Sequence, residues 1–145
     1  MIHLIKSLSD PRSALLKDDP VRPHIHHEIR FGDGKFVFAL MDESIVKAIS
    51  CAKICQTVPR DEAELFDAEI SASILVFYTI WSYKLGAGQQ LIRDGLDYAR
   101  EHLPEITKFV TLSPLTETAR KFHLRNGATV FRTNLDSVNY EYQLR

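Results

Sequence analysis

Residues 73–92 read SILVFYTIWSYKLGAGQQLI, and this stretch decides the fold that the sequence predicts. Its first part, residues 73–81, is an apolar run of strand length, which indicates a strand buried on both faces. Gly86, Ala87 and Gly88 follow at once, and from Gln89 onward apolar side chains recur at helical spacing until Pro104. The stretch therefore predicts a buried strand that turns through glycines into an amphipathic helix, as in an α/β or α+β domain.

The segments on either side complete a mixed sheet flanked by helices. Before the central stretch we expect a short helix that begins near Pro11, a β-hairpin of residues 35–41 and 44–55, and a polar loop with a helical turn at residues 59–67. After it we expect a second buried strand at residues 108–112, a helix from Ser113-Pro114 to the stop at Asn126-Gly127, and a closing antiparallel pair at residues 128–132 and 138–144.

Composition restricts the class of protein. The chain has 145 residues, of which 45% are hydrophobic and 26% charged, and no repeat or linker divides it, so we expect a single domain over residues 1–145. Its 18 Lys and Arg residues nearly balance 19 Asp and Glu residues, which argues against nucleic acid as a partner. The longest apolar stretch, residues 74–81, is too short to span a membrane, and the first residues show no leader, so we expect a cytoplasmic protein.

Two groups of metal-ligand residue types have simpler explanations. Cys51 and Cys55 are too few for a disulfide framework, and their spacing places both on one face of a strand, which favours core packing. His24, His26, His27 and Glu28 cluster in sequence, but no further ligand set accompanies them. We therefore expect no metal.

The loop of residues 84–88, KLGAG, is the first candidate for chemistry. Glycines between a strand and a helix let backbone N–H groups approach a pyrophosphate, with help from the helix dipole. A tight structural turn explains the same residues equally well. The loop is not a dinucleotide fingerprint, because Leu91 stands where the third glycine would fall.

In this context the chain resembles the GNAT acyltransferases, in which a strand, a G-x-G loop, a helix, a strand and a helix ending in a glycine follow in this order. In that family the loop pattern is Gln/Arg-x-x-Gly-x-Gly/Ala, and it holds the pyrophosphate of coenzyme A. Here Tyr83 stands in place of the Gln or Arg. The family often has a tyrosine general acid four residues before the helix-ending glycine, and counting back from Gly127 gives His123. The resemblance implies a sheet that splays between its fourth and fifth strands.

A more specific resemblance is to malonyl-CoA decarboxylases, whose catalytic domain is GNAT-like. It rests on FVTLSP at residues 109–114 and FHLRNGA at residues 122–128, supported by residues 77–80, 91–92 and 138–142. By these motifs Ser113 and His123 match the catalytic serine and histidine of that family. The sequence departs from it after Pro114, where a Gly-Phe pair is missing, and it lacks a long insert and an N-terminal helical domain.

The implied chemistry suits these two residues. Decarboxylation of a malonyl thioester places negative charge on the thioester oxygen and then requires a proton at the α-carbon. Ser113 would polarise the thioester, and His123, with an ordinary pKa of about 6.5, would act as acid and base. A helix that starts near Thr116 puts His123 roughly 10 Å along its axis. We therefore expect the two side chains to bracket the acyl group and not to form a tight pair.

The resemblance also implies the binding of an acyl-CoA thioester, either malonyl-CoA or acetyl-CoA. Pantetheine should follow the strand of residues 77–81, and the pyrophosphate should rest on backbone of residues 84–89. Trp81 and Tyr83 fit the mouth of this cleft, although ordinary packing explains them equally well. The expected coenzyme A contacts are Phe77, Tyr78, Thr79, Ile80, Trp81, Lys84, Leu85, Gly86, Ala87, Gly88, Gln89 and Asn126.

Other interpretations remain open from the residues alone. Ser113 before Pro114 is also a plausible helix cap, and His123 a partly buried surface histidine. The second function is an N-acetyltransferase that moves an acetyl group from acetyl-CoA to an amine, with Glu69 or Asp67 as the candidate base. The third is a non-catalytic acyl-CoA binding module. The sequence is compatible with self-association and does not name the acyl group.

Overall fold

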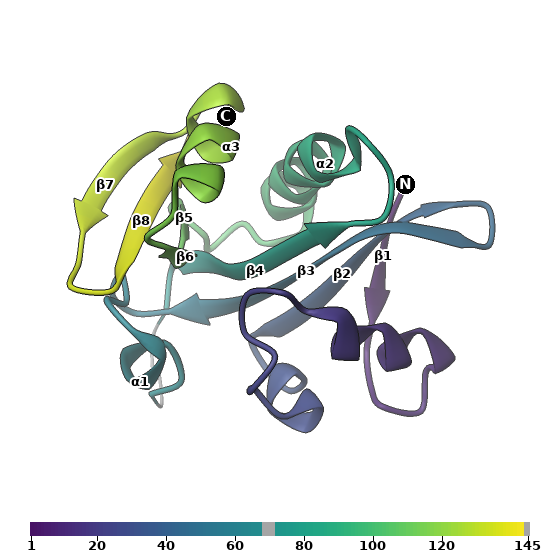
Figure 1. Cartoon of the computed structure of the whole chain (residues 1–145). Helices are drawn as coiled ribbons and strands as arrows, with labels where there is room; N and C mark the ends of the chain where they lie inside the picture. Colours follow the sequence, from purple (N-terminus) through teal and green to yellow (C-terminus); the bar gives the residue numbers. More distant parts are fainter. Residues whose placement is uncertain (68–71, 144–145) are drawn as a thin grey trace. The chain divides into compact units, whose positions relative to one another are not determined.

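The computed structural model describes residues 1–67 and 72–143. It divides into two compact units, and Figure 1 labels the helices and strands along the chain. The first unit holds Met1–Ala52 and Thr79–Asp97, and the second holds Lys53–Tyr78 and Tyr98–Arg145. Within the described ranges eight strands form one mixed sheet in the order β1-β2-β3-β4-β5-β8-β6, with β7 paired to β8. This is the α+β architecture that the sequence predicts.

The first unit begins with elements that the sequence predicts only in part. β1 (Ile2–Ile5) was not expected, because it is short; it pairs antiparallel with β2 (Lys35–Asp42), with Ile2 opposite Leu40. β2 and β3 (Ile45–Cys55) are neighbours in the sheet and form the expected hairpin, with Glu43 at φ 56° in its turn. The sequence therefore located the hairpin and missed the edge strand.

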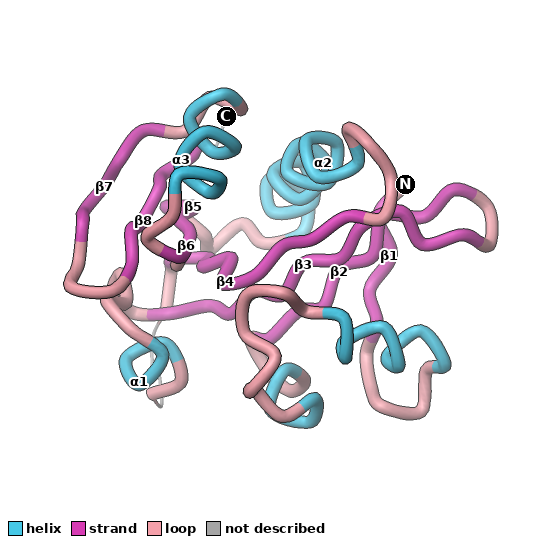
Figure 2. Tube along the Cα trace, viewed as in Figure 1, coloured by secondary structure: helices cyan, strands magenta, loops and turns pink. Residues whose placement is uncertain are grey.

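Two 3-10 helices connect β1 to β2, and Figure 2 shows them as short helical turns. The first, η1 (Pro11–Asp18), has proline at its start, and Asp10 caps it by accepting a hydrogen bond from the Arg12 N–H at 2.9 Å. Its buried residues are Ser13 and Leu16, and a spacing of three suits the three residues per turn of this helix type. The second, η2 (His27–Arg30), contains the fully buried Arg30.

The central strand and helix form as predicted. β4 (Ile74–Ser82) is buried along most of its length, and α2 (Ala87–His102) follows it. β4 pairs in parallel with β5 (Lys108–Thr111), from Ile74 opposite Lys108 to Phe77 opposite Thr111. β5 ends there while β4 continues to Ser82, so the ladder stops before the end of β4, as a splayed sheet requires.

The second unit also contains α1 (Glu62–Leu65), β6 (Ser113–Pro114), α3 (Glu117–Arg125), β7 (Thr129–Thr133) and β8 (Ser137–Tyr142). The expected helix start near Thr116 is confirmed, because Thr116 caps α3 by accepting from the Ala119 N–H at 3.2 Å. The alternative in which Ser113 caps this helix is wrong, because Ser113-Pro114 pairs with β8. The expected helix stop is confirmed, because Gly127 adopts a φ of 98°. Among the described residues no helix has the length and apolarity needed to cross a membrane.

Candidate active site

Ser113 and His123 lie in direct contact in the second unit. Ser113 sits on β6, opposite Val138 of β8, and His123 sits in the second turn of α3. The Ser113 Oγ is 3.2 Å from Nε2 of His123, and both residues are 4% exposed. Two residue types that carry proton transfer therefore share one buried hydrogen bond.

The expectation that these residues lie far apart is wrong. It assumed that the axial rise of the helix separates them, but Ser113 is not part of the helix. Pairing with β8 fixes Ser113 in the sheet, while the turn before Glu117 lets α3 fold back over the same strands, as Figure 1 shows for α3 beside β5, β6 and β8. The side chain of His123 then reaches Ser113 across the helix–sheet interface.

The pair belongs to a longer chain of polar groups. The Tyr142 hydroxyl lies 2.8 Å from Nδ1 of His123, and the Ser113 hydroxyl donates to Oγ1 of Thr111 at 2.7 Å. Thr111 Oγ1 also accepts from the Tyr140 N–H at 3.1 Å. If Ser113 donates to Thr111, it must accept from Nε2–H, and Nδ1 must accept from Tyr142. The chain then runs in one direction from Tyr142 through His123 and Ser113 to Thr111.

Burial keeps this chain neutral. Desolvation lowers the pKa of His123 to about 4, which corrects the expectation of an ordinary value near 6.5. Desolvation also raises the pKa of Tyr142, so its hydroxyl keeps its proton. His123 is thus an uncharged imidazole at neutral pH whose two ring nitrogens both have uncharged partners. A catalytic histidine of a Ser-His-Asp triad has a charged carboxylate as a partner, whereas the partners of His123 are uncharged.

Aromatic rings fix the orientation of the imidazole. The Tyr140 ring stacks on His123 at a centroid distance of 4.9 Å, and Phe122 meets it edge-on at 5.1 Å. Tyr140 and Tyr142 alternate along β8 and therefore present their rings on the same face. The sequence analysis noticed this segment but gave neither tyrosine a role. The i, i+2 spacing of two tyrosines in a strand next to a histidine-bearing helix is the signal that identifies them.

The glycine loop lies in the first unit at the start of α2. Gly86 adopts a φ of 80°, a conformation that favours glycine, and α2 begins at Ala87. The first N–H groups of a helix have no acceptor within the helix, so Gly88 and Gln89 present theirs at this end. Lys84 and Leu85 are exposed, while Ala87 is buried. The loop therefore has the backbone geometry of an anion site.

Side chains just before the loop are tied to η1. Trp81 Nε1 donates to the Tyr83 hydroxyl at 3.0 Å, and that hydroxyl donates to Asp18 at 2.8 Å. The Tyr83 N–H donates to the Lys47 carbonyl at 2.8 Å. Tyr83 thus anchors the loop entry to the 3-10 helix and to β3 in place of the Gln or Arg that the family pattern has there.

Several expected coenzyme A contacts have side chains that pack within the protein. Phe77 stacks on Phe109 at 4.5 Å, Tyr78 meets Phe66 edge-on, and Thr79 donates to Asp19 at 2.7 Å. The Asn126 amide donates to the Phe122 carbonyl at 2.8 Å and so caps α3. For Phe77, Tyr78 and Thr79 the contribution left to a ligand is that of the main chain.

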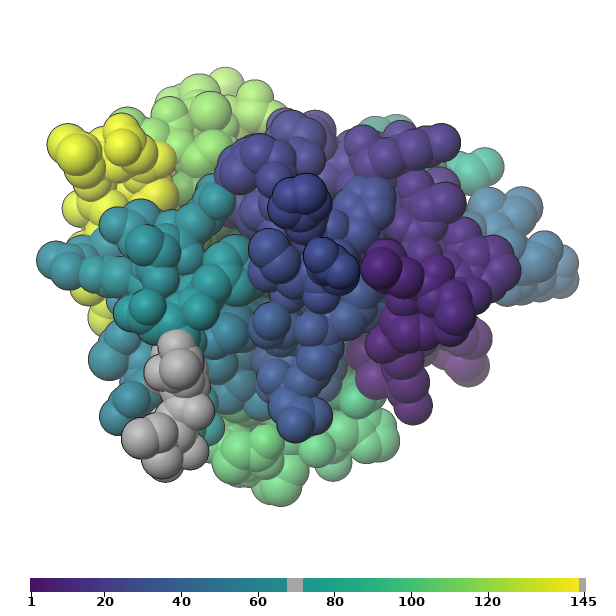
Figure 3. Space-filling model, turned by 90° about the horizontal axis from the view of Figure 1, so that it is seen from below, coloured from purple at the N-terminus to yellow at the C-terminus, as the bar shows by residue number. Residues whose placement is uncertain are grey.

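The first unit contains a buried ion pair that the sequence analysis missed. Asp19 accepts from Arg30 at 2.7 Å, from Thr79 at 2.7 Å and from the N–H groups of Val21 and Arg22. Arg30 also donates to the Cys51 sulfur at 3.5 Å, and both cysteines are buried and form no disulfide, as expected for core residues. The segment with η1 and η2 forms one continuous surface in Figure 3, in purple and dark blue. The ion pair holds this segment together.

Two further candidates were the acidic residues proposed as a base. Asp67 is exposed in the second unit, and Glu69 lies outside the described residues. Nowhere in residues 1–67 and 72–143 do three or more His, Cys, Asp and Glu side chains gather as a metal site would require.

No protein-family model matches the chain, and a search of curated proteins finds no match. Solved structures do share its fold. The malonyl-CoA decarboxylase from Rhodopseudomonas palustris superposes with a TM-score of 0.74 at 18% identity, over 99% of this chain and 60% of that one. The malonyl-CoA decarboxylase from Agrobacterium vitis gives 0.70 at 21% identity, over 88% of this chain and 36% of that one.

A third similar structure matches along its whole length. It is a GNAT-family protein from Desulfovibrio desulfuricans, with a TM-score of 0.68 at 12% identity, over 100% of this chain and 99% of that one. This chain therefore spans about one third to three fifths of the two decarboxylases and nearly all of the GNAT-family protein.

Proposed function

Because the chain has the GNAT fold, we propose that it is an enzyme acting on an acyl-CoA thioester, and that it decarboxylates malonyl-CoA to acetyl-CoA and carbon dioxide. The observation that carries this proposal is the buried hydrogen bond between Ser113 and His123. The same two residues match the catalytic pair of the decarboxylases by motif. The similarity in fold to two malonyl-CoA decarboxylases adds support.

In this proposal three sets of residues have separate roles. The backbone of residues 84–89 holds the pyrophosphate, aided by the dipole of α2 and by Lys84. The pantetheine follows the main chain of Phe77, Tyr78, Thr79, Ile80 and Trp81. Ser113, His123 and the neighbouring Asn126 contact the acyl group of the acyl-CoA. Because backbone N–H groups neutralise the phosphates, a net charge of -1 is no obstacle to binding.

The neutral state of His123 determines its role in the proposed reaction. The bond between the carboxylate carbon and the α-carbon breaks, carbon dioxide leaves, and the electron pair moves onto the thioester oxygen. A hydroxyl or an uncharged imidazole N–H stabilises that oxygen, as neutral histidines do elsewhere. As the α-carbon takes the proton of Nε2, Nδ1 of His123 takes the hydroxyl proton of Tyr142, so the imidazole stays neutral, and Tyr142 then regains a proton from solvent. Tyr142 and Thr111 hold the donor groups in orientation throughout.

The test uses the purified full chain with malonyl-CoA, following carbon dioxide and acetyl-CoA. We expect His123→Gln and Ser113→Ala each to lower kcat by about 10²–10⁴-fold, the range of one proton-transfer group. His102→Gln is the matched control, because it removes an exposed histidine of the same unit and should keep full activity. Circular dichroism confirms that each variant folds. Wild-type protein that releases no carbon dioxide would contradict the proposal.

The second candidate is an N-acetyltransferase, and one observation favours it. The putative GNAT-family acetyltransferase from Desulfovibrio desulfuricans shares the fold of this chain, with a TM-score of 0.68. Acetyl-CoA with a panel of amines, followed by free thiol, tests this reaction. Thiol release that requires an amine supports transfer and excludes decarboxylation as the main activity. Coenzyme A binding without turnover of either substrate identifies a binding module instead.

A further inference from the structure

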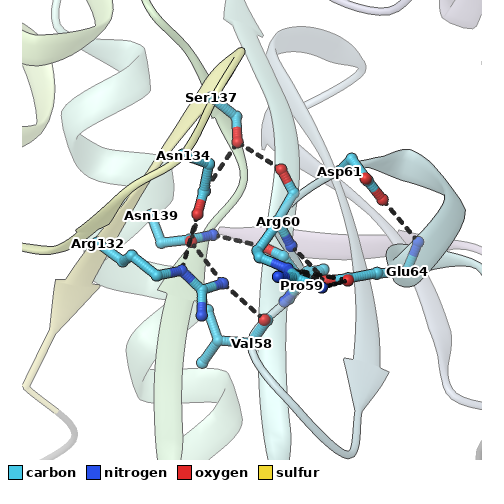
Figure 4. A network of polar contacts seen from close by, with 9 residues as sticks. All are labelled: Val58, Pro59, Arg60, Asp61, Glu64, Arg132, Asn134, Ser137 and Asn139. Carbon is cyan, nitrogen blue, oxygen red and sulfur yellow. Dashed lines mark hydrogen bonds and ion pairs between the residues drawn. The ribbon is translucent and has the colours of Figure 1, made fainter.

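A polar cavity of about 410 Å³ lies in the second unit, apart from Ser113 and His123. Arg132 of β7, Arg60 and Glu64 near α1, and Asp67 contribute its charged lining. Figure 4 shows Arg132, Arg60 and Glu64 with the groups that hold them. We call this cavity the Arg132 pocket. Its lining combines two guanidinium groups with two carboxylates, so its ligand chemistry depends on which of these charges are already paired.

Arg132 is held by uncharged oxygens. Its Nε donates to Asn134 Oδ1 at 2.7 Å, and its Nη2 donates to the Val58 carbonyl at 2.9 Å and to Asn139 Oδ1 at 3.3 Å. Nη1 makes no hydrogen bond to any residue within the described ranges, and no carboxylate there forms an ion pair with this guanidinium. The positive charge is therefore oriented but not neutralised by contact.

The groups that orient Arg132 are themselves fixed. Asn139 is fully buried and donates to the carbonyls of Pro59 at 2.9 Å and Thr111 at 2.8 Å. Asn134 Nδ2 donates to Asn139 Oδ1 and to Ser137 Oγ, both at 2.9 Å, and Ser137 donates to the Arg60 carbonyl at 2.7 Å. Figure 4 shows these residues joined to one another by hydrogen bonds. A ligand that meets Arg132 would pay little ordering entropy.

The two carboxylates differ in their pairing. Glu64 accepts three hydrogen bonds from the Arg60 side chain and one from its N–H, and these bonds lower the pKa of Glu64 to about 2. Arg60 and Glu64 therefore form an ion pair, and the charge of Arg132 also acts on Glu64 without direct contact. Asp67 lines the same pocket, and its carboxylate makes no hydrogen bond or ion pair with any other described residue. The pocket thus offers one open cation, Arg132, and one open anion, Asp67.

We propose that the Arg132 pocket binds a small zwitterion of the amino-acid class, with its carboxylate on Nη1 of Arg132 and its ammonium group on Asp67. A ligand with only negative charge would meet repulsion from Glu64 and Asp67, and one with only positive charge would meet repulsion from Arg60 and Arg132. A zwitterion makes a charge-assisted hydrogen bond at each end. This binding does not depend on which acyl-CoA reaction the protein performs.

The first experiment is a titration of the full chain by NMR, observing the Arg132 Nε–Hε signal. The probes are glycine, β-alanine and 4-aminobutyrate, whose charges lie successively further apart, with acetate and methylamine as single-charge controls. We expect at least one zwitterion to shift the signal saturably, with an affinity at least about tenfold above either control. The zwitterion that binds most tightly indicates how far apart the charges of Arg132 and Asp67 lie. Equal binding of acetate, or no saturable shift with any zwitterion, would overturn the proposal.

The second experiment uses variants. Asp67→Asn changes an exposed side chain and should leave folding intact, while weakening the bound zwitterion at least about tenfold and leaving acetate unaffected. Arg132→Lys, which keeps the charge but loses the planar fork, should weaken both. Asp136→Asn and Arg125→Gln are controls outside the pocket and should bind as wild type. Unchanged zwitterion affinity in Asp67→Asn would overturn the assignment even if Arg132→Lys proved unstable.

Discussion

Each unit buries a cluster of polar groups. The titratable side chains are charged in the cluster of the first unit and uncharged in the cluster of the second. In the first unit Asp19 and Arg30 have side chains with no exposed surface and form an ion pair. In the second unit His123 is also buried, but among the described residues its ring nitrogens meet only the hydroxyl groups of Ser113 and Tyr142. Burial opposes charge in both places, so the partners decide the outcome.

The pKa values express this difference. Burial alone would raise the pKa of Asp19, but hydrogen bonds from Arg22, Arg30, Thr79 and Val21 together lower it, so the carboxylate stays ionised. For His123 burial is the dominant cause and no charged partner opposes it, so the pKa falls. The ion pair of Asp19 and Arg30 is suited to holding chain segments together. The neutral cluster holds the His123 imidazole in a form that carries one transferable proton.

Breaking the charged cluster should have the largest effect on stability. Arg30→Met leaves Asp19 without its counter-ion in a site that excludes water, and we expect the free energy of unfolding to fall by about 3–5 kcal/mol. Urea unfolding measures this loss. The double variant Asp19→Asn/Arg30→Met should recover part of it, because no unpaired charge is then buried. A loss below about 1 kcal/mol in Arg30→Met would contradict the assignment.

The neutral cluster should appear in the pH dependence of stability. The pKa of His123 is about 4 in the folded protein against about 6.5 when unfolded, so above pH 6.5 its contribution to stability is complete. As the pH falls from 6.5 to 4 the unfolded chain takes up a proton that the folded one refuses, which costs about 3 kcal/mol in total. Asp19, with a lowered pKa, loses its contribution only below its ordinary value of 3.8.

The measurement is urea unfolding at a series of pH values. His123→Gln should flatten the slope between pH 6.5 and 4 and leave the slope below pH 3.8 in place. Asp19→Asn should flatten the slope below pH 3.8 and leave the slope between pH 6.5 and 4 in place. A wild-type slope that survives His123→Gln would show that His123 is not buried in its neutral form.

Removal of a single hydroxyl from each cluster gives the smallest and most direct comparison. Thr79→Val deletes a hydrogen bond to an ionised carboxylate and should cost about 2 kcal/mol. Tyr142→Phe deletes one to an uncharged imidazole and should cost about 1 kcal/mol. Thermal unfolding of both variants tests the order, and ¹⁵N NMR of His123 should show a changed tautomer population only in Tyr142→Phe. Equal losses of unfolding free energy in the two variants would contradict the difference between the charged and the neutral cluster.

Sequence patterns located most elements and the two candidate catalytic residues. The run of residues 73–92 gave β4 and α2, and two short motifs singled out Ser113 and His123. Local patterns did not predict the strands that form only by pairing with a distant segment of the chain. β1 exists because β2 offers it an edge, and Ser113-Pro114 became β6 because β8 lies beside it. Tyr142 and Asn139 were missed as functional candidates because their partners are 19 and 28 residues away in the chain.

The sequence by itself determined the order of elements, the glycine conformations at Gly86 and Gly127, and the identity of the groups available for chemistry. These follow from side-chain periodicity and from local backbone sterics, which act over a few residues. Only the tertiary structure decided that Ser113 touches His123, that His123 is uncharged, and that Arg132 and Asp67 line the same pocket. Contact, burial and charge pairing depend on segments far apart in the chain, and these meet only in the folded protein.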